Sequence, residues 1–526
     1  MRTYAPSWRT AIKSYIPSIT LQPHWTTLKT YFSTLTPFHQ TPYSPIRYRP
    51  RRLLTLLTIL TSLLVIIITF FHFTTTSFPT IIDRPPVDRS CANTKNINDY
   101  YHHLQPQLVF GESSTWSQRF LDLKRGQMME WVKEEILEYD EKRVTPAGRG
   151  SRGIVSTVSM GRLQSTLTLL GLLKRLGCIL PVELFHFGDE MTLPGMRVVR
   201  EFEGLNVTLR DVEDGNNIVP VRRKGKKRDG SEGYQIKIAA ILSSSFEDVL
   251  FLDSDVLPVT DPTFLFDLWE FREKGAVFWP DLWKTHTTSK IWSLTQTPCR
   301  NEFEFETGQL LLSRSKTWPA LHLTHYMNTI DSQFFYKLLW YDKDTFRFAF
   351  KTLKTPYHMM PRWVGFAGFV QPTGAGVFCG HSMAQADHVG KWVFMHGNSL
   401  KRVDLRTLRE EIEKVGGKGR KRKEIFEWIQ VVDVPIGREW MTPVSVKGFQ
   451  SEGEFAPVGG YGAGEVKKRT MSCHAFFSGR GEPSTKLQDF EKVLPGFNEM
   501  LLEEYEGAAA VLEQMAGGKG IVEELE

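Results

Sequence analysis

FEDVLFLDSDVLPVTDPTFLFD, residues 246–267, decides how the rest of the chain is interpreted. An apolar run, Val249 to Leu252, ends in Asp253 and Asp255, which are separated by a single serine. The run is typical of a buried strand, and a buried carboxylate is costly unless it is paired or binds a metal ion. The pattern therefore predicts that a cation lies at the end of this strand.

The segments before this strand predict a parallel sheet. "RGIVSTVSM" and "LPVELFHFG" have the composition of strands, and the segment between them carries leucines at helical spacing, Leu163, Leu167, Leu170 and Leu173. A second helix, "YQIKIAAILSSS", leads into the opening stretch. Strand, helix, strand is a βαβ unit, so we expect residues 148–445 to form an α/β domain with the opening strand third or fourth. Ligands of such sheets bind where the two aspartates lie, at the carboxyl ends of the strands.

The N-terminal part of the chain has a different character. Residues 1–52 contain eight basic and no acidic residues, and residues 53–71 contain no charge. A helix of 19 residues spans roughly 28 Å, about the hydrocarbon thickness of a bilayer. With the positive-inside rule, this predicts a cytosolic tail, a signal-anchor helix at 53–72 and a lumenal stem at 73–147. A buried core helix and a mitochondrial transit peptide are the alternatives.

Charge and cysteine content limit the remaining classes. Beyond residue 52 the chain holds 57 basic and 59 acidic residues, so no nucleic-acid partner is expected. The five cysteines show neither a CxxC motif nor zinc-site spacing, which allows one or two disulfides with one thiol left over and leaves the pairing open. They are Cys91, Cys178, Cys299, Cys379 and Cys473.

The Asp-Ser-Asp motif has two chemical interpretations. In haloacid-dehalogenase-type phosphatases a DxD supplies a nucleophile and a general acid, but on the first strand of the domain, whereas α/β pattern precedes it here. In nucleotide-sugar glycosyltransferases, a DxD at a strand end holds a divalent cation that binds the donor diphosphate, and oxygen ligands suit Mn²⁺ or Mg²⁺. A simple turn after a strand is the third alternative.

Three later segments carry polar residues that favour the glycosyltransferase interpretation. A neutral histidine completes an oxygen and nitrogen site for Mn²⁺, a following glycine lets the backbone approach phosphate, and a lysine neutralises the leaving diphosphate. The segments are "FEFETGQLLLSRSKTWPAL" with Glu306 and Gln309, "WYDKDTFRFAF" with Asp342 and Asp344, and "KWVFMHGNSLKR" with His396, Gly397 and Lys401.

With the opening stretch and "LKRLGCILPVELFHFGDEM", these segments resemble the fungal Golgi α-mannosyltransferase family that builds mannan and outer-chain branches. The resemblance covers roughly residues 150–402. It implies a type II membrane enzyme with a GT-A fold, a Rossmann-like sheet that binds a nucleotide sugar. The basic loop at 222–228 looks like an insertion, and residues 446–526 form a C-terminal extension without a counterpart or an assigned role.

The resemblance also implies roles for individual residues. Asp253, Asp255 and His396 would bind the metal, with Asp253 bridging to the ribose. The remaining candidates would contact the donor, the sugar or the acceptor. Lys237, Lys401 and Gly397 are placed near the diphosphate, Gln309 near the sugar or the acceptor, and Glu306, Asp342 and Asp344 at the reacting sugar or the acceptor.

The implied reaction is retaining transfer of mannose from GDP-mannose to mannose residues of glycoprotein glycans or cell-wall mannan, with Mn²⁺ or Mg²⁺. The expected location is the Golgi membrane with a lumenal catalytic domain, and other Golgi mannosyltransferases are expected partners. Another metal-dependent hexosyltransferase and an inactive glycan-binding scaffold subunit are the alternatives. The linkage, α-1,2 or α-1,3, and the glycan class of the acceptor stay open.

Overall fold

The computed structural model describes residues 111–221, 233–300, 302–370, 378–400, 404–415, 424–432, 443–450, 470–476 and 485–517. The chain splits into two units, Met1–Pro86 and Val87–Glu526, and all described residues belong to the second. The predicted membrane span at 53–72, the loop at 222–228 and Lys401 lie outside the described residues. Among those that are described, no helix combines the length and apolarity needed to cross a bilayer.

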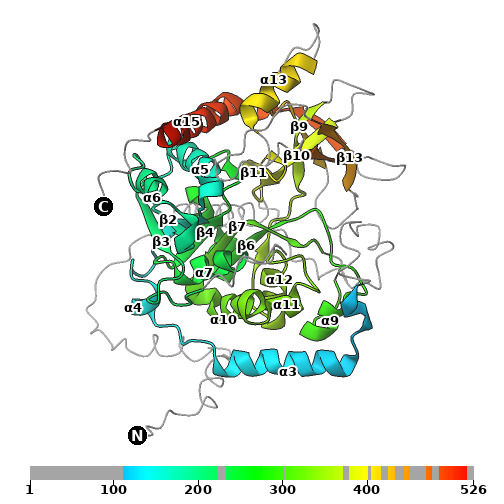
Figure 1. Ribbon diagram of the computed structural model, residues 1–526. Coiled ribbons are helices and arrows are strands. Elements are labelled where there is room, and N and C mark those ends of the chain that lie inside the picture. Colours follow the sequence, from blue (N-terminus) through cyan, green and yellow to red (C-terminus); the bar gives the residue numbers. More distant parts are fainter. Residues whose placement is uncertain are drawn as a thin grey trace, which may run out of the picture. The chain divides into compact units, whose positions relative to one another are not determined.

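A mixed sheet carries the opening stretch (Figure 1). Its strand order in the described residues is β3-β2-β1-β4-β7-β6-β8. The strands are β1 (Arg152–Thr157), β2 (Val182–His186), β3 (Val207–Asp211), β4 (Asp248–Leu252), β6 (Ala276–Pro280), β7 (Phe305–Ser313) and β8 (His358–Met359). The first four are parallel, whereas β7 is antiparallel to β4 and β6. The expected α/β sheet is confirmed, and the opening strand is the fourth parallel strand along the chain.

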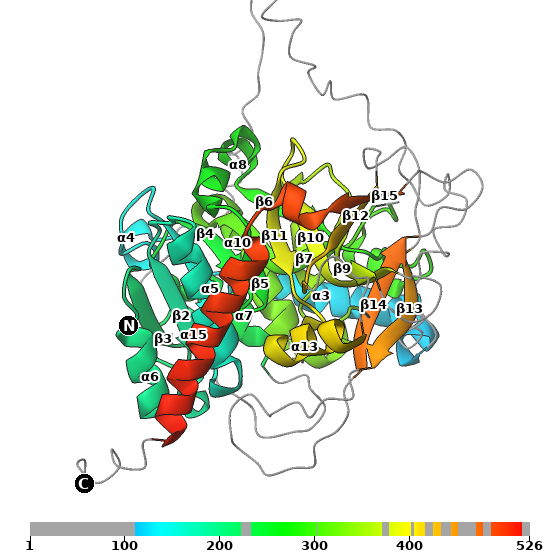
Figure 2. The ribbon, with the colours of Figure 1, turned by 90° about the horizontal axis from the view of Figure 1, so that it is seen from above.

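Helices cover both faces of this sheet (Figures 1 and 2). On β4, Leu250 and Leu252 pack into the cluster on one face, and Val249 and Phe251 pack into the cluster on the other. Burial on both faces explains why the strand is a continuous apolar run rather than an alternating one. The helices of the first face are α5 (Leu163–Arg175), α6 (Leu193–Arg200) and α15 (Phe497–Gly517), and those of the second are α7 (Gln235–Ser243), α10 (Arg314–His325) and α12 (Thr345–Thr352).

A second, antiparallel sheet follows along the chain, and the sequence did not predict it. Its described strands run in the order β13-β14-β10-β9-β12-β15, with β11 paired to both β10 and β5. They are β5 (Val256–Pro258), β9 (Gly365–Val370), β10 (Phe378–Ala386), β11 (Trp392–His396), β12 (Trp428–Val432), β13 (Pro443–Gln450), β14 (Thr470–Phe476) and β15 (Thr485–Asp489). Because β5 directly follows the Asp-Ser-Asp motif, this sheet is joined to the end of β4.

The helical stretch expected in the stem is α3 (Gln118–Glu134). Its Leu121 and Met128 are buried in a cluster with residues of α9, so this part of the predicted stem packs on the domain. The other described helices are α4 (Glu141–Val144), α8 (Trp269–Lys274), α9 (Lys290–Thr295), α11 (Ser332–Phe335), α13 (Leu405–Val415) and α14 (Phe490–Val493). The short 3₁₀ helices are η4 (Glu112–Thr115), η5 (Met160–Arg162), η6 (Gly188–Glu190) and η7 (Pro262–Asp267), and η8 (Tyr326–Ile330) is a short π-helix.

The C-terminal helix α15 belongs to the core of the domain. Its Ala508 lies in the cluster formed by α5 and the first sheet, and its Leu501 lies in the cluster of the second sheet. The two helices approach closely at Gly171 on α5, where a Cβ atom would lie 2.0 Å from the carboxylate of Glu504. Part of the 446–526 extension therefore completes both apolar clusters.

The described cysteines are divided between disulfides and a thiol. Cys299 and Cys379 are each disulfide-bonded, whereas Cys178 is buried and free. The expectation of at least one disulfide is confirmed, whereas the expected number of leftover thiols stays a prediction. Disulfides persist in oxidising compartments such as the secretory lumen.

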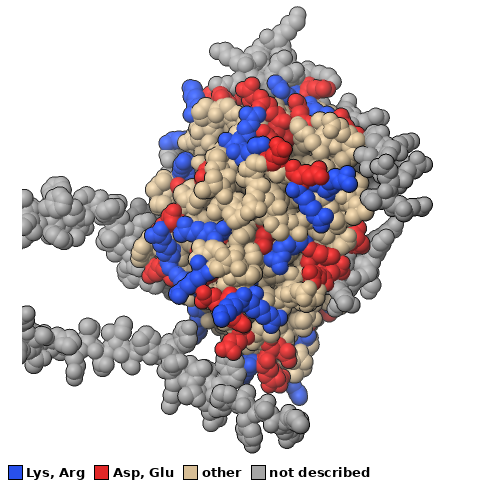
Figure 3. Space-filling view, turned by 90° about the vertical axis from the view of Figure 1, so that its left-hand side faces the viewer, with Lys and Arg blue, Asp and Glu red and all other residues tan. Residues whose placement is uncertain are grey.

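Charged side chains of both signs are interspersed on the face that Figure 3 shows. No broad area of that face is of one sign, as the near balance of acidic and basic residues beyond residue 52 leads one to expect. The expectation that nucleic acid is not a partner stays a prediction.

Candidate active site

The pairing of β5 with β11 brings the predicted metal ligands together. Val256 is opposite His396 in the register, and the Gly397 N–H donates to the Asp255 carbonyl oxygen at 2.8 Å. One ligand atom from each of Asp253, Asp255 and His396 lies within 4.8 Å of the other two. Residues about 140 positions apart in sequence thus form one cluster at the carboxyl end of β4.

The donor set of this cluster suits a divalent cation. It offers two carboxylates and an imidazole, a combination of oxygen and nitrogen ligands that Mn²⁺ accepts. The side chains of Asp253, Asp255 and His396 are 27%, 12% and 8% exposed, so a ligand can reach the carboxylates while the ring is held in place. The three predicted ligands therefore fit the expected metal.

Glu306 lies behind the His396 ring. Its Oε1 is 3.1 Å from Nδ1, and Nε2 on the other side of the ring is 3.4 Å from Asp255 Oδ1. Burial opposes charge on the imidazole, but Glu306 and Asp255 outweigh it and raise the pKa of His396 to about 10. Burial likewise opposes ionisation of Glu306, yet His396 lowers the pKa of Glu306 to about 2. A carboxylate in this position orients a metal-binding histidine, and binding of a cation at Nε2 would release the proton there.

Gly308 leaves the space that the His396 ring occupies. A Cβ atom on Gly308 would lie 2.7 Å from both Cε1 and Nδ1 of His396. Gly308→Ala is therefore expected to displace the ring and to lower transferase turnover by about 10- to 100-fold, the usual cost of disturbing a ligand's support. Turnover against metal concentration, measured beside thermal melting, checks this. Gly507→Ala on α15, where a Cβ meets nothing within 4 Å, is the matched control. Normal turnover in Gly308→Ala would show that the ring position does not matter.

Lys237 connects the aspartate motif to Asp342. From α7 its ammonium lies 3.0 Å from Asp253 Oδ2, 3.1 Å from Asp342 Oδ2 and 2.9 Å from the Thr307 carbonyl oxygen. Burial alone would lower the pKa of Lys237, but the two carboxylates raise it above its ordinary value. Lys237 is thus a fixed positive charge at the edge of the candidate metal-ligand site. It brings together Asp253 and Asp342, which the sequence predicted separately for the site.

The other predicted residues are placed differently. Gln309 is fully buried on β7 opposite Leu252, and its amide oxygen and nitrogen have no hydrogen-bond partner among the described residues. The Gly397 N–H is used by Asp255, so its predicted approach to phosphate stays a prediction. Asp344 is buried in a separate network and contacts Arg347 at 2.7 Å. The roles predicted for these residues remain predictions.

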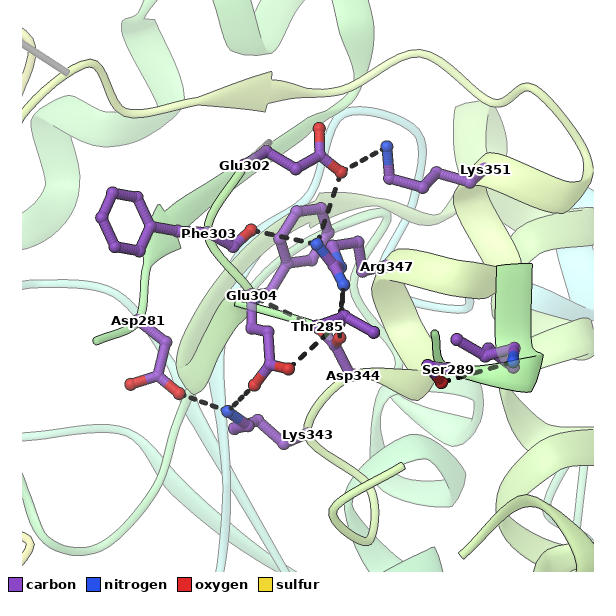
Figure 4. A network of polar contacts seen from close by, with 12 residues as sticks. Asp281, Thr285, Ser289, Glu302, Phe303, Glu304, Lys343, Asp344, Arg347 and Lys351 are labelled. Atoms are coloured by element: carbon purple, nitrogen blue, oxygen red, sulfur yellow. Dashed lines mark hydrogen bonds and ion pairs between the residues drawn. The ribbon is translucent and has the colours of Figure 1, made fainter. Parts of the chain in front are cut away.

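Sequence reasoning missed a buried acidic residue that interacts electrostatically with Glu306. Asp281 follows β6 directly, so it shows the same signal as Asp253, a carboxylate at the end of a buried strand. Burial and nearby carboxylates, Glu306 among them, together outweigh the opposing effect of Lys343 and raise the pKa of Asp281 to about 6. Lys343 forms ion pairs with Asp281 and Glu304 (Figure 4).

The buried network in Figure 4 continues from Glu304 to Arg347. The Thr285 hydroxyl lies 3.0 Å from both Glu304 Oε1 and Asp344 Oδ2 and can donate its proton to either. The Arg347 guanidinium contacts Asp344 at 2.7 Å and Glu302 at 3.4 Å. The Arg347 side chain has no exposed surface. The network therefore fixes the start of α12 and the residues just before β7, which carries Glu306.

Comparison with known proteins finds similarity to mannosyltransferases. Residues 151–303 and 300–387 match a family described as "Mannosyltransferase putative". The Candida albicans alpha-1,2-mannosyltransferases MNN2 and MNN21 are 26% and 25% identical to the chain, over 50% and 57% of its length. The alpha-1,2-mannosyltransferase MNN2 of Saccharomyces cerevisiae is 21% identical over 61% of the chain and 59% of its own length.

The chain is similar to this fungal mannosyltransferase family over residues 151–387. The predicted resemblance is thereby confirmed. The mannosyltransferase match includes the Asp-Ser-Asp motif and ends before His396. The chain spans about half the length of the two C. albicans mannosyltransferases, 51% and 53%.

Solved glycosyltransferase structures resemble this chain only weakly. The galactosyltransferase LgtC in complex with donor and acceptor sugar analogues is 15% identical, with a TM-score of 0.29 over 40% of this chain and 73% of that one. Mouse xyloside xylosyltransferase 1 is 14% identical, with a TM-score of 0.29 over 40% of this chain and 85% of that one. At these scores the likeness carries no conclusion about this chain.

Proposed function

We propose that the chain is a metal-dependent α-mannosyltransferase that transfers mannose from GDP-mannose to a mannose residue of a glycan. The observation that carries the proposal is the cluster of Asp253, Asp255 and His396 at the carboxyl end of β4, in a chain whose residues 151–387 match a family described as "Mannosyltransferase putative". The sheet that carries it would be the nucleotide-sugar-binding sheet of a GT-A fold. The relatives named above are alpha-1,2-mannosyltransferases, and this favours an α-1,2 product.

The residues of the site divide the work of the transfer. In the reaction, the bond from mannose C1 to the diphosphate breaks, a bond from C1 to the acceptor oxygen forms, and the acceptor proton leaves with the diphosphate. A bound Mn²⁺ or Mg²⁺ would neutralise charge on the diphosphate, held by Asp253, Asp255 and His396. Glu306 orients the histidine, and Lys237 keeps Asp253 in place.

Further carboxylates lie near these residues. Asp342 is held by Lys237, and Asp281 is close enough to Glu306 for the two to affect each other electrostatically. Carboxylates in this region would stabilise positive charge that develops on the mannosyl group.

The test of this function is a donor and metal panel on the purified full-length chain. Incubated with Mn²⁺, mannobiose, and a panel of GDP- and UDP-sugars, the protein should consume GDP-mannose and give a trisaccharide that an α-1,2-specific mannosidase cleaves. Turnover of a UDP-sugar instead would favour another hexosyltransferase. Glycan binding without any turnover would favour a scaffold subunit, and phosphate release from a sugar phosphate would favour a phosphatase.

We further propose that the enzyme is anchored in the Golgi membrane with its catalytic domain in the lumen, where it would meet other mannosyltransferases. The uncharged stretch at 53–71, the basic residues before it and the disulfide-bonded Cys299 and Cys379 support this orientation. Protease added outside sealed microsomes is expected to remove only residues 1–52. A protected N-terminus with an accessible C-terminus would show that the opposite topology is correct.

A further inference from the structure

Four aromatic side chains gather beside the candidate active site. They are Tyr234, just before α7, and Tyr336, Trp340 and Tyr341, between α11 and α12, and we call them the aromatic cluster. Tyr341 stacks on Tyr234 with ring centroids 4.7 Å apart, and it meets Tyr336 and Trp340 edge-on at 5.6 Å and 5.5 Å. Tyr341 is therefore the centre of the cluster.

The cluster stays at the surface although its chain neighbours are buried. Leu338 and Leu339 are each 2% exposed and belong to an apolar cluster, whereas Trp340 is 36% and Tyr234 is 39% exposed. Tyr341 has a φ of 51°, a left-handed conformation that is uncommon for an aromatic residue and that costs energy. Core packing explains neither the exposed rings nor this backbone conformation.

Three members of the cluster, Tyr336, Trp340 and Tyr341, line a hollow of suitable size and polarity for a sugar. Its volume is about 250 Å³, and Tyr336, Leu339, Trp340 and Tyr341 form its apolar wall. The rim carries Glu112 and Lys337, which pair with each other at 2.7 Å and so leave little net charge. A pocket with aromatic walls and a few polar groups at its edge is typical of sites for small neutral ligands.

Two chain connections join the cluster to the metal ligands. Tyr341 precedes Asp342, whose carboxylate lies 3.1 Å from the Lys237 ammonium. Tyr234 lies one helical turn before Lys237, which contacts Asp253 at 3.0 Å. The cluster is thus continuous with the site in which the donor sugar would react.

We propose that the aromatic cluster binds a pyranose ring of the acceptor, an uncharged oligomannoside, and so positions its terminal hydroxyl for transfer. A pyranose has an apolar C–H face, which packs on an aromatic ring, and hydroxyl groups at its edge, which meet the polar rim. The exposed rings, the neutral hollow and the link to Asp253 all fit such a ligand. The assignment rests on the mannosyltransferase function proposed above.

The test uses the purified full-length chain and three variants. Trp340→Ala removes an exposed ring, Trp340→Phe keeps an aromatic ring, and Trp269→Ala removes a 68% exposed tryptophan on α8 outside the cluster. Trp340→Ala is expected to raise the KM for mannotriose about tenfold. The KM for GDP-mannose and the rate at which GDP-mannose is hydrolysed without acceptor should change less than twofold. Trp340→Phe should retain most of the acceptor affinity, and Trp269→Ala should behave as wild type.

Three results would overturn the proposal: an unchanged acceptor KM in Trp340→Ala, an equal rise in Trp269→Ala, or a matching rise in the KM for GDP-mannose. Binding of mannotriose, followed by saturation-transfer NMR, separates this proposal from the proposed function. If the wild type turns over no donor but binds mannotriose, and Trp340→Ala does not bind it, the sugar site stands and the reaction is wrong. If the wild type does not bind mannotriose, the sugar site is wrong.

Discussion

Asp255→Ala is expected to lower the turnover of GDP-mannose by about 100-fold or more and to leave the fold intact. The change removes the carboxylate that lies 3.4 Å from His396 Nε2. Loss of a residue that only supports a metal ligand lowers activity by about 10- to 100-fold, so loss of a ligand should lower activity by at least as much. Stability without metal should change little, because the repulsion between Asp255 and Asp253, which raises the pKa of Asp253, is lost together with the ion pair between Asp255 and His396.

Turnover measured against Mn²⁺ concentration, with thermal melting in the presence and absence of metal, checks this prediction. Two further variants act as comparisons. Asp253→Asn should be milder, because an amide oxygen still binds weakly, and His396→Ala should resemble Asp255→Ala. Near-normal turnover in Asp255→Ala, or a wild type that is fully active in EDTA, would refute the metal site. A much lower melting temperature of the metal-free variant would make the motif a structural turn.

Arg347→Met is expected to lower the free energy of unfolding by about 3–5 kcal/mol, the usual cost of removing one partner from a buried ion pair. The guanidinium is fully buried and contacts Asp344, Glu302 and the Phe303 carbonyl oxygen. A methionine fills similar space but leaves buried carboxylates without their main counter-charge. Chemical denaturation of the full-length chain measures the loss.

The stability deficit of Arg347→Met, its loss of unfolding free energy relative to the wild type, should depend on pH. Burial already raises the pKa of Asp344 in the wild type, against the lowering effect of Arg347, so removal of Arg347 raises that pKa further. The folded variant then binds a proton more tightly than the unfolded chain, and the deficit shrinks as the pH falls toward the ordinary carboxyl pKa of about 4. Arg175→Met, at an exposed ion pair with Glu504, is the control and should leave the denaturation midpoint nearly unchanged. Equal midpoints for both variants would show that the Figure 4 network is dispensable.

Local sequence patterns predicted the part of the fold that is built from consecutive elements. The run from β1 through α5 to β2, and from α7 to β4, follows from hydrophobic periodicity, because each element packs on its neighbour in sequence. The second sheet could not be predicted in this way. Its strands pair over long separations, as β10 pairs with β14, and no local pattern encodes such partners.

The candidate site was predictable in its residues but not in its geometry. The two aspartates were identified by their position after a buried strand, and the same signal at Asp281 was overlooked. The position of Glu306 near His396 Nδ1 depends on strand register, and a register shift between Val277 and Trp279 of β6 lies directly opposite that part of β7. Because a shift of one residue changes the face on which a side chain lies, the sequence alone could not place it.

The position of α15 has a consequence for synthesis of the protein on the ribosome. Every candidate ligand has been translated once His396 emerges, yet the apolar face of α5 is covered only when residues about 100 positions later arrive. Leu501 and Tyr505 of α15 also line a small cavity of about 40 Å³ together with Asp255. A chain released before α15 would therefore carry the chemistry of the site but expose apolar surface, the usual signal for chaperones and degradation. Chains that lack α15 would therefore be removed before they could act.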